Sequence, residues 1–105
     1  MEIAVVDVAD RSRFEIRADG ETAGVVAYHR RPGVIAFVHT EIDPRFEGRG
    51  LASTLIRTAL AEARSAGESV LPFCPFVRSY IARHREYVDL VPNEVRARFR
   101  LTADV

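Results

Sequence analysis

The chain has 105 residues, which suits one domain with a single core. Fifteen basic and fifteen acidic residues cancel, so no general field attracts nucleic acid or an anionic membrane, and any anion site must be local. Every basic residue is arginine, a side chain that prefers planar, bidentate recognition of phosphate or carboxylate. One cysteine excludes an internal disulfide. With no apolar leader and no membrane-spanning stretch, we expect a soluble cytoplasmic protein.

Four strands are predicted in the first half of the chain. Residues 3–8, 13–17, 21–29 and 34–42 are rich in β-branched residues or alternate apolar with polar side chains. Asp19-Gly20 is a strong hairpin signal, because a tight turn of this kind needs positive φ. Short turns separate the other strands. The pattern predicts an antiparallel meander.

The second half predicts a helix, a strand and a shorter helix. Two apolar series recur at helical spacing, Leu51, Leu55 and Ala59 in one and Ala52, Ile56, Leu60 and Ala63 in the other. A strand over 69–73 follows, and it should pair in parallel with 34–42 through a right-handed connection. Pro75 suits the first position of a helix over 76–83. We place the domain at 1–91 and an extension at 92–105, in which a short helix and a loose tail are both open.

The corner between the strand over 34–42 and the long helix carries Arg45-x-x-Gly48-x-Gly50. Glycines there let successive backbone N–H groups point into one hollow, and a helix N-terminus favours anions such as a diphosphate. A Walker A loop is excluded, because Leu51 follows Gly50 and the chain has no lysine. A dinucleotide fingerprint also fits poorly, because residues 43–47 separate the glycines from the strand.

This corner resembles the Arg/Gln-x-x-Gly-x-Gly/Ala loop of the GNAT acetyltransferases. Further similarity lies in Val38-His39-Thr40, in Cys74-Pro75-Phe76-Val77 and in Arg83-His84-x-Glu86-Tyr87. The combination is similar to a short, single-domain GNAT-like subfamily. The resemblance implies an α/β fold with a GNAT-like mixed sheet, in which an antiparallel meander precedes a β-α-β parallel pair and a short C-terminal helix.

The resemblance also implies a site for acetyl-CoA, with no metal. The pyrophosphate would meet the loop, and the thioester would lie between residues 39–42 and Cys74. Arg45 and Arg49 would be available for phosphate charge. The implied cofactor-binding residues are Ile42, Arg45, Phe46, Glu47, Gly48, Arg49, Gly50, Leu51 and Ala52.

His39 and Glu41 are the candidates for proton removal from an acceptor ammonium. They alternate onto one face of the strand, and the GNAT superfamily commonly uses a group at this place. Two plainer interpretations stay open: Glu41 as a solvated carboxylate at a strand end, and His39 as a core histidine.

Cys74 and Tyr80 complete the catalytic candidates. A Cys74 thiolate could accept the acetyl group and pass it on, although a free cysteine most often simply packs in the core. The resemblance places Tyr80 near a tyrosine that protonates the CoA thiolate in many relatives, with core packing as the other interpretation.

The expected function is acetyl transfer from acetyl-CoA to an unidentified primary amine, on a small molecule or a protein. The alternative is a CoA-binding or interaction module without catalysis. Between residues 8 and 13 there is only a turn where most relatives have helices, so we expect an open, shallow acceptor side. We expect a monomer or a weak dimer, with no nucleic-acid or membrane partner.

Overall fold

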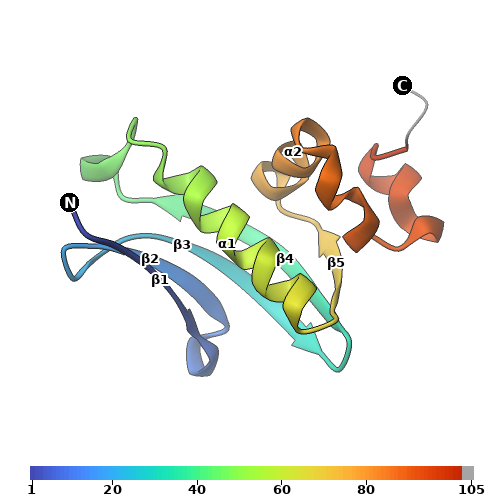
Figure 1. Cartoon of the computed structure of the whole chain (residues 1–105), viewed down its shortest axis with the longest axis horizontal. Helices are drawn as coiled ribbons and strands as arrows, with labels where there is room; N and C mark the ends of the chain where they lie inside the picture. Colours follow the sequence, from blue (N-terminus) through green and yellow to red (C-terminus); the bar gives the residue numbers. More distant parts are fainter. Residues whose placement is uncertain (103–105) are drawn as a thin grey trace.

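The computed structural model describes residues 1–102, which form a mixed sheet with two α-helices and four short 3-10 helices (Figure 1). The strands are β1 (Ile3–Val8), β2 (Arg13–Ala18), β3 (Glu21–Arg31), β4 (Val34–Ile42) and β5 (Ser69–Pro72). The α-helices are α1 (Leu51–Ser65) and α2 (Pro75–Arg83), and the 3-10 helices are η1 (Ala9–Arg11), η2 (Pro44–Phe46), η3 (Arg85–Leu90) and η4 (Asn93–Phe99). No helix in this part of the chain is long and apolar enough to cross a bilayer.

The sheet confirms the predicted meander. Its order is β1-β2-β3-β4-β5, and each of the first three pairings is antiparallel. The predicted hairpin turn has φ of 50° at Asp19 and 84° at Gly20, as a tight primed turn requires. Strands β4 and β5 pair in parallel, with α1 as the connection. The predicted fold class is therefore confirmed.

Helix α1 buries one apolar face against the sheet. The buried positions are Leu51, Leu55, Ile56, Ala59, Leu60 and Ala63, as the periodicity predicted. Ala52 differs from the prediction, because it lies half-exposed beside the glycine bend instead of in the core. The burial explains why the helix forms where it does, since most helical stability in proteins comes from packing of such a face.

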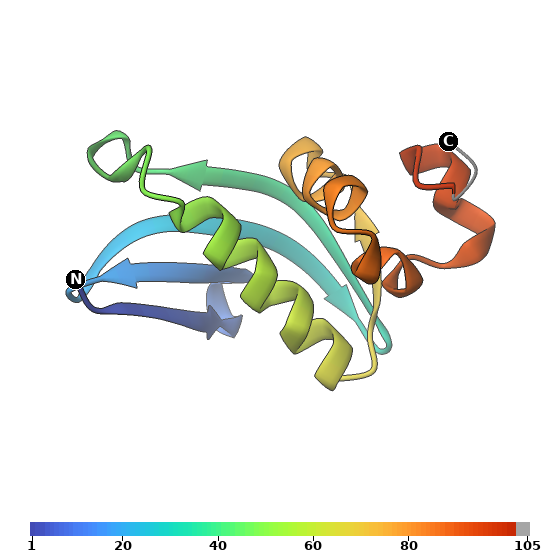
Figure 2. The same cartoon turned by 45° about the horizontal axis from the view of Figure 1, so that its top comes forward.

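Both α-helices cover the same face of the sheet (Figure 2). That face presents Phe14 and Phe37, whose rings lie 6.4 Å apart, and both side chains are almost completely buried. Val77 and Ile81 of α2 are fully buried in the same core. The core thus lies between one face of the sheet and the two helices.

Strand β4 carries a bulge and then separates from β5. Tyr28 pairs with Phe37 and Ala27 pairs with His39, so Val38 has no opposite residue on β3. On the other side, pairing with β5 ends where Phe37 meets Pro72. Figure 1 shows the two strands diverging beyond that point. Residues 38–42 of β4 therefore have one edge without a strand neighbour.

The segment after Pro92 packs onto the domain. Residues 93–99 form η4, Phe99 is 8% exposed and Leu101 is fully buried. The rings of Phe73 and Phe99 meet edge to face at 5.3 Å. The sequence left open whether this segment is a short helix or a loose tail. Up to residue 102, it is a packed 3-10 helix. Residues 103–105 of the predicted extension lie outside the described residues, and the boundary at residue 91 stays a prediction.

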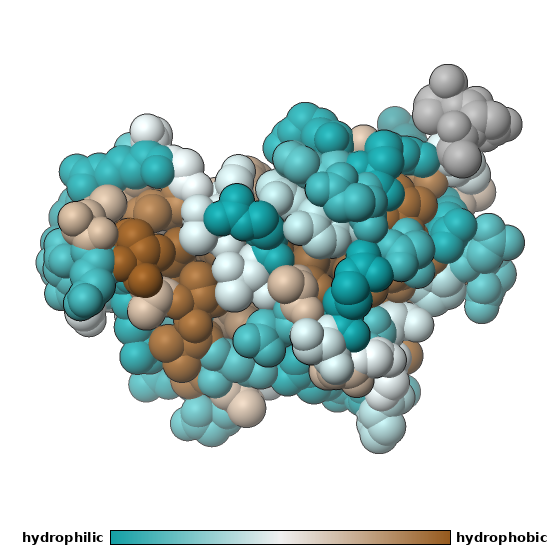
Figure 3. Space-filling model, in the orientation of Figure 1, coloured by the Kyte–Doolittle hydropathy of each residue, from teal (hydrophilic) through white to brown (hydrophobic). Residues whose placement is uncertain are grey.

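The first strands expose apolar surface beside the N-terminus. Only η1 connects β1 and β2, and α1 does not reach over the whole of this pair (Figure 1). Met1 is 63% exposed and Ile3 is 36% exposed. Figure 3 shows brown, apolar surface gathered in this part of the molecule. The prediction of an open, shallow acceptor side, made from the missing helices, stays a prediction.

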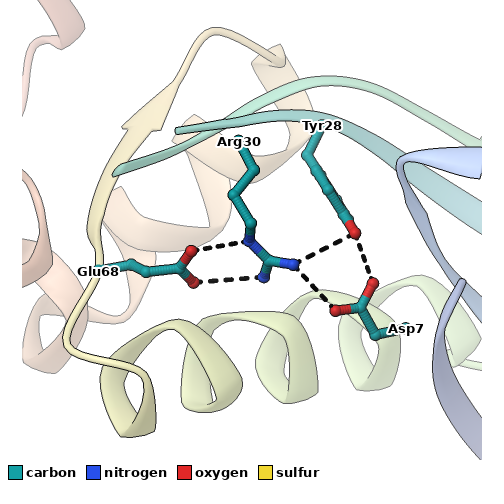
Figure 4. A network of polar contacts seen from close by, with 4 residues as sticks. All are labelled: Asp7, Tyr28, Arg30 and Glu68. Carbon is teal, nitrogen blue, oxygen red and sulfur yellow. Dashed lines mark hydrogen bonds and ion pairs between the residues drawn. The ribbon is translucent and has the colours of Figure 1, made fainter. Parts of the chain in front are cut away.

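A charged network ties β1 and β3 to the turn before β5 (Figure 4). The Arg30 guanidinium donates to Asp7 Oδ2 at 3.0 Å and to Glu68 Oε2 at 2.7 Å. Tyr28 donates its hydroxyl to Asp7 Oδ1 at 2.5 Å, and burial together with this carboxylate raises the pKa of Tyr28 to about 12. The guanidinium also lies 4.6 Å from the centre of the Tyr28 ring. One arginine thus joins three segments that are far apart in sequence.

Replacing Arg30 tests how much this network holds the edge strand. We expect Arg30→Gln to lower the free energy of unfolding by about 1–2 kcal/mol, because two carboxylates lose a charged partner that is partly exposed to water. Urea unfolding followed by circular dichroism measures the change. Arg31→Gln is the matched control, since Arg31 is exposed and has no ion pair among residues 1–102. Equal stability of the two variants would contradict the prediction.

Glu15 is a buried carboxylate on the other face of the sheet. It is 4% exposed and receives hydrogen bonds from Arg13 Nε at 2.8 Å and from Arg17 Nη2 at 3.0 Å. The hydrogen bond from Arg13 is the largest cause that lowers the pKa of Glu15 below its ordinary value of 4.5, against an opposing effect of burial. Because the folded-state pKa is lowered, this stabilisation is present above pH 4.5 and is lost as pH falls through the folded-state pKa.

Glu15→Gln should therefore make stability less sensitive to acid. We expect the variant to lose more than about 1 kcal/mol of unfolding free energy at pH 7, and to lose less than the parent chain on acidification below pH 4.5. Thermal unfolding measured from pH 7 to pH 3 gives both quantities. Glu62→Gln on the exposed side of α1 is the control, and it should follow the parent chain. An unchanged acid response in Glu15→Gln would contradict the assignment.

Candidate functional site

The predicted corner lies between β4 and α1 and is built by local hydrogen bonds and two glycines. Asp43 begins η2 by accepting the Arg45 backbone N–H at Oδ1, 2.9 Å away. Gly48 has φ of 79°, and Gly50 has φ of 72° at the N-cap of α1. A side chain at either position would strain the backbone, because positive φ is costly for other residues. No side chain of residues 1–102 caps this end of α1.

Six consecutive backbone N–H groups at this corner have no acceptor in the described part of the chain. The turn before them closes with Glu47 N–H on the Pro44 carbonyl, and the helix begins with Thr54 N–H on the Gly50 carbonyl at 3.3 Å. Residues 48–53 lie between these bonds, and none of their N–H groups donates to the protein. Such a run at a helix N-terminus is suited to an anion.

A hollow of about 200 Å³ lies against these groups. It is lined by Ile42, Phe46, Glu47, Gly48, Gly50, Leu51, Ala52 and Ser53. Seven of these eight residues are among the predicted cofactor-binding residues, and Ser53 is the one that the sequence reasoning missed. Its position in the first turn of the long helix was the available signal. The structure thus brings the predicted loop residues together around one space, while their binding of CoA stays a prediction.

The two loop arginines differ in their availability for phosphate. Arg45 is 3.2 Å from Asp43 and 3.3 Å from Glu21, so carboxylates already match its charge. Arg49 is exposed, lies over the Phe46 ring at 5.6 Å and has no ion pair within residues 1–102. Arg49 is therefore the more available of the two arginines that were predicted to meet phosphate charge.

Cys74 stands where β5 leaves the sheet. Its backbone N–H donates to the Phe37 carbonyl at 2.8 Å, and the residue is 3% exposed. The Cys74 Sγ lies 3.0 Å from Thr40 Oγ1, across the separation between β4 and β5. Thr40 is a second contact that the sequence reasoning did not select, although it stands next to His39. The pair marks the inner, helix-covered side of this gap.

His39 and Glu41 lie on the opposite face of the sheet from Cys74. They pair with Ala27 and Val25 of β3, whereas Thr40 pairs with the fully buried Val26. His39 Nε2 and Glu41 Oε2 are 3.6 Å apart, and their side chains are 62% and 70% exposed. The prediction that they share a face is confirmed, and the interpretation of His39 as a core histidine is wrong.

Tyr80 lies on α2 and is buried among aromatic rings. Its ring stacks on His84 at 4.0 Å and approaches Tyr87 at 5.9 Å, with 3% of the residue exposed. Burial is the largest cause that raises the pKa of Tyr80. The phenol therefore keeps its proton at neutral pH, on the helix-covered side of the sheet. Core packing describes its observed contacts, and the acid role stays a prediction.

Comparisons with known proteins assign the fold and the family. The sequence matches the family described as GCN5-related N-acetyl-transferase over residues 13–90, so the chain belongs to that family of acetyltransferases. No curated protein matches the sequence. Within residues 1–102, no group of three or more His, Cys, Asp or Glu side chains could hold a metal ion.

Two solved structures share the fold at 20% sequence identity. Ard1 from Thermoplasma volcanium has a TM-score of 0.51, with 59% of this chain and 43% of that chain covered. Ribosomal-protein-alanine N-acetyltransferase from Brucella melitensis biovar Abortus 2308 has a TM-score of 0.55, with 81% and 66% covered. This chain therefore spans less than two thirds of the length of either protein. Together with the family match, they confirm the GNAT resemblance and the mixed sheet.

Ser53→Glu tests the anion-binding character of the corner. A carboxylate in the first turn should stabilise α1 by about 0.3–1 kcal/mol, yet it should compete with a phosphate for the same N–H groups. We expect the affinity for coenzyme A and for inorganic pyrophosphate to fall about tenfold or more, measured by calorimetry. Ser53→Gln is the neutral control of the same size. Retained affinity in Ser53→Glu, with the variant still folded, would place anion binding elsewhere.

Proposed function

We propose that this protein is an acetyl-CoA-dependent N-acetyltransferase that transfers an acetyl group to a primary amine. The observation that carries the proposal is the run of N–H groups at residues 48–53 around a hollow, with no protein acceptor in the described chain. A diphosphate is the ligand chemistry that satisfies several such groups at once. Membership of the acetyltransferase family supports acetyl-CoA as its source.

In this proposal the rest of CoA follows the open edge of β4. Residues 38–42 have no neighbouring strand on the β5 side, so their outward backbone groups are available to the amides of the pantetheine arm. The arm would run from the hollow toward Cys74, and Arg49 would meet phosphate charge. The thioester would then lie between the helix-covered side, with Cys74, and the open face, with His39 and Glu41.

The proposed reaction is direct attack by the amine nitrogen on the thioester carbonyl carbon. The new C–N bond forms as the C–S bond breaks, the nitrogen gives up a further proton to become an amide, and the CoA thiolate leaves and takes a proton. The acceptor must first lose a proton from its ammonium, and Glu41 with His39 at 3.6 Å is the exposed pair able to receive it. Tyr80, protonated at neutral pH, is the candidate donor to the thiolate.

We favour direct transfer over a two-step route through Cys74. The Cys74 side chain is buried, and its Sγ is already in hydrogen-bond contact with Thr40. In the two-step route, the acetyl group would move to Cys74 Sγ with release of CoA, and the amine would then cleave that thioester. This route requires a covalently acetylated protein, which direct transfer does not.

A non-catalytic CoA-binding module is the second candidate. The specific observation that favours it is the exposure of His39 and Glu41, at 62% and 70%, because water screens and solvates such groups. A module of this kind would bind CoA at the glycine bend and leave acetyl-CoA and amines unchanged.

Glu41→Gln separates the two candidates. With labelled acetyl-CoA and a set of primary amines, we expect acetyl transfer by the parent chain and a fall in kcat/KM of about 10²-fold in Glu41→Gln. CoA affinity, measured by calorimetry, should not change. Glu62→Gln on α1 is the control for loss of one carboxylate. CoA binding without transfer by the parent chain would favour the non-catalytic module.

Cys74→Ala decides between direct transfer and the two-step route. If transfer is direct, the variant should keep its transfer rate within about tenfold, and intact-mass measurement should show no acetylated protein. The measurement is made on parent and variant after mixing with acetyl-CoA alone. An acetyl adduct in the parent chain that is lost in Cys74→Ala, together with lost transfer, would establish the covalent route instead.

A further inference from the structure

A second hollow lies between β5 and η4, outside the predicted CoA site. It has a volume of about 290 Å³ and is lined by Leu71, Phe73, Val95, Arg98 and Phe99. Four of these side chains are apolar, and Phe73 remains 58% exposed although it contacts the buried Phe99 ring. An exposed aromatic side chain at the wall of an apolar hollow is suited to bind a hydrocarbon or aromatic group.

This hollow opens on the same face of the sheet as His39 and Glu41. Leu71 of β5 pairs with Ala36 of β4, and paired residues share a face. Ala36 in turn pairs with His29 of β3, while His39 pairs with Ala27, two residues away on the same face. The apolar hollow and the carboxylate of Glu41 therefore lie on the same face of the sheet. The hollow is near one end of the open edge of β4, and Glu41 is near the other end.

The hollow also begins where the strands separate. Phe73 directly precedes Cys74, whose N–H makes the last backbone contact with β4, at Phe37. A strand rise of about 3.3 Å per residue puts Ala36 and His39 about 10 Å apart along β4. A small molecule with an apolar group in the hollow can thus reach the separation of the strands with an amine only a few bonds away.

A different hollow of about 350 Å³ lies on the other side of Glu41 and is the competing acceptor site. It is lined by Arg13, Thr22, Ala23, Gly24, Val25, Glu41, Ile42, Asp43 and Pro44. It is more polar, and it lies toward β2 and β3, where β4 is fully paired, so it is farther from the separation of β4 and β5. An acceptor bound there would be small and polar.

We propose that the acceptor is a primary amine attached to an apolar group, which binds the hollow formed by Leu71, Phe73, Val95 and Phe99. This inference rests on the proposed function. The exposed Glu41 carboxylate makes the far end of the same face negative, which favours the approach of an ammonium group, while Arg98 at the hollow repels a second positive charge. The arrangement therefore selects apolar monoamines against hydroxyl-bearing amines and against diamines.

A panel of four amines tests the selection. With acetyl-CoA in excess, kcat/KM is measured for 2-phenylethylamine, n-butylamine, ethanolamine and putrescine. We expect 2-phenylethylamine to exceed ethanolamine by about tenfold or more, since even one methylene in an apolar pocket is worth about tenfold or more in discrimination, and putrescine to rank last. Equal rates, or a preference for ethanolamine or putrescine, would overturn the proposal and favour the polar hollow.

Two variants locate the selection. Phe73→Ser changes an exposed side chain of the apolar hollow and should lower the ratio of 2-phenylethylamine to ethanolamine rates toward one. Thr22→Val changes the competing hollow and should leave that ratio as in the parent chain. An unchanged ratio in Phe73→Ser would overturn the proposal.

A binding measurement separates this proposal from the proposed function. Amide shifts are followed by NMR while 2-phenylethylamine is added to the protein with CoA, and shifts centred on Leu71, Phe73, Val95 and Phe99 are expected. No shifts there, or shifts centred on residues 22–25, would overturn the proposal. Binding in the hollow without acetyl transfer would support this site and contradict the transferase. Acetyl transfer without binding in the hollow would support the transferase and contradict this site.

Discussion

The separation of β4 from β5 is the constraint on which the site depends. Parallel pairing stops where Phe37 meets Pro72, and Val38 forms a bulge at the same level, so β4 continues with one free edge. Pro72 and the turn at Phe73 carry β5 away from the sheet, and the bulge alters the direction of β4. Without this separation, the proposed anion site at the glycine bend would have no path toward Cys74.

The sheet separates the candidate residues on its helix-covered face from those on its open face. One face is covered by α1 and α2, and there Cys74 and Tyr80 are buried and Thr40 is half-buried. The other face has no α-helix over it in the described chain, and there His39 and Glu41 are exposed to water. In the proposed reaction, the donor thioester lies between these faces, and the acceptor arrives from the open one.

Ion pairs at the edges of the sheet support the small core. Arg30 joins β1, β3 and the turn before β5, and Glu15 gathers Arg13 and Arg17 on the open face. A chain of this length has little apolar area to spare, so ion pairs that connect distant segments have a larger share in holding the edge strand. The arginine-only basic composition suits this use, because a guanidinium bonds two carboxylates at once.

Sequence alone determined the features that depend on local pattern. Strand alternation, the Asp19-Gly20 hairpin, the apolar face of α1 and the glycine bend are all short-range signals, and each is where it was predicted apart from the half-exposed Ala52. Only the tertiary structure decided the contacts that depend on long-range packing. It matched Arg45 with Glu21 and Asp43, put Cys74 against Thr40, exposed His39, and folded η4 over Leu71 and Phe73 to form the apolar hollow. Apart from the local pair of Arg45 and Asp43, these contacts join residues that no short-range pattern relates, because they arise from sheet register and strand separation.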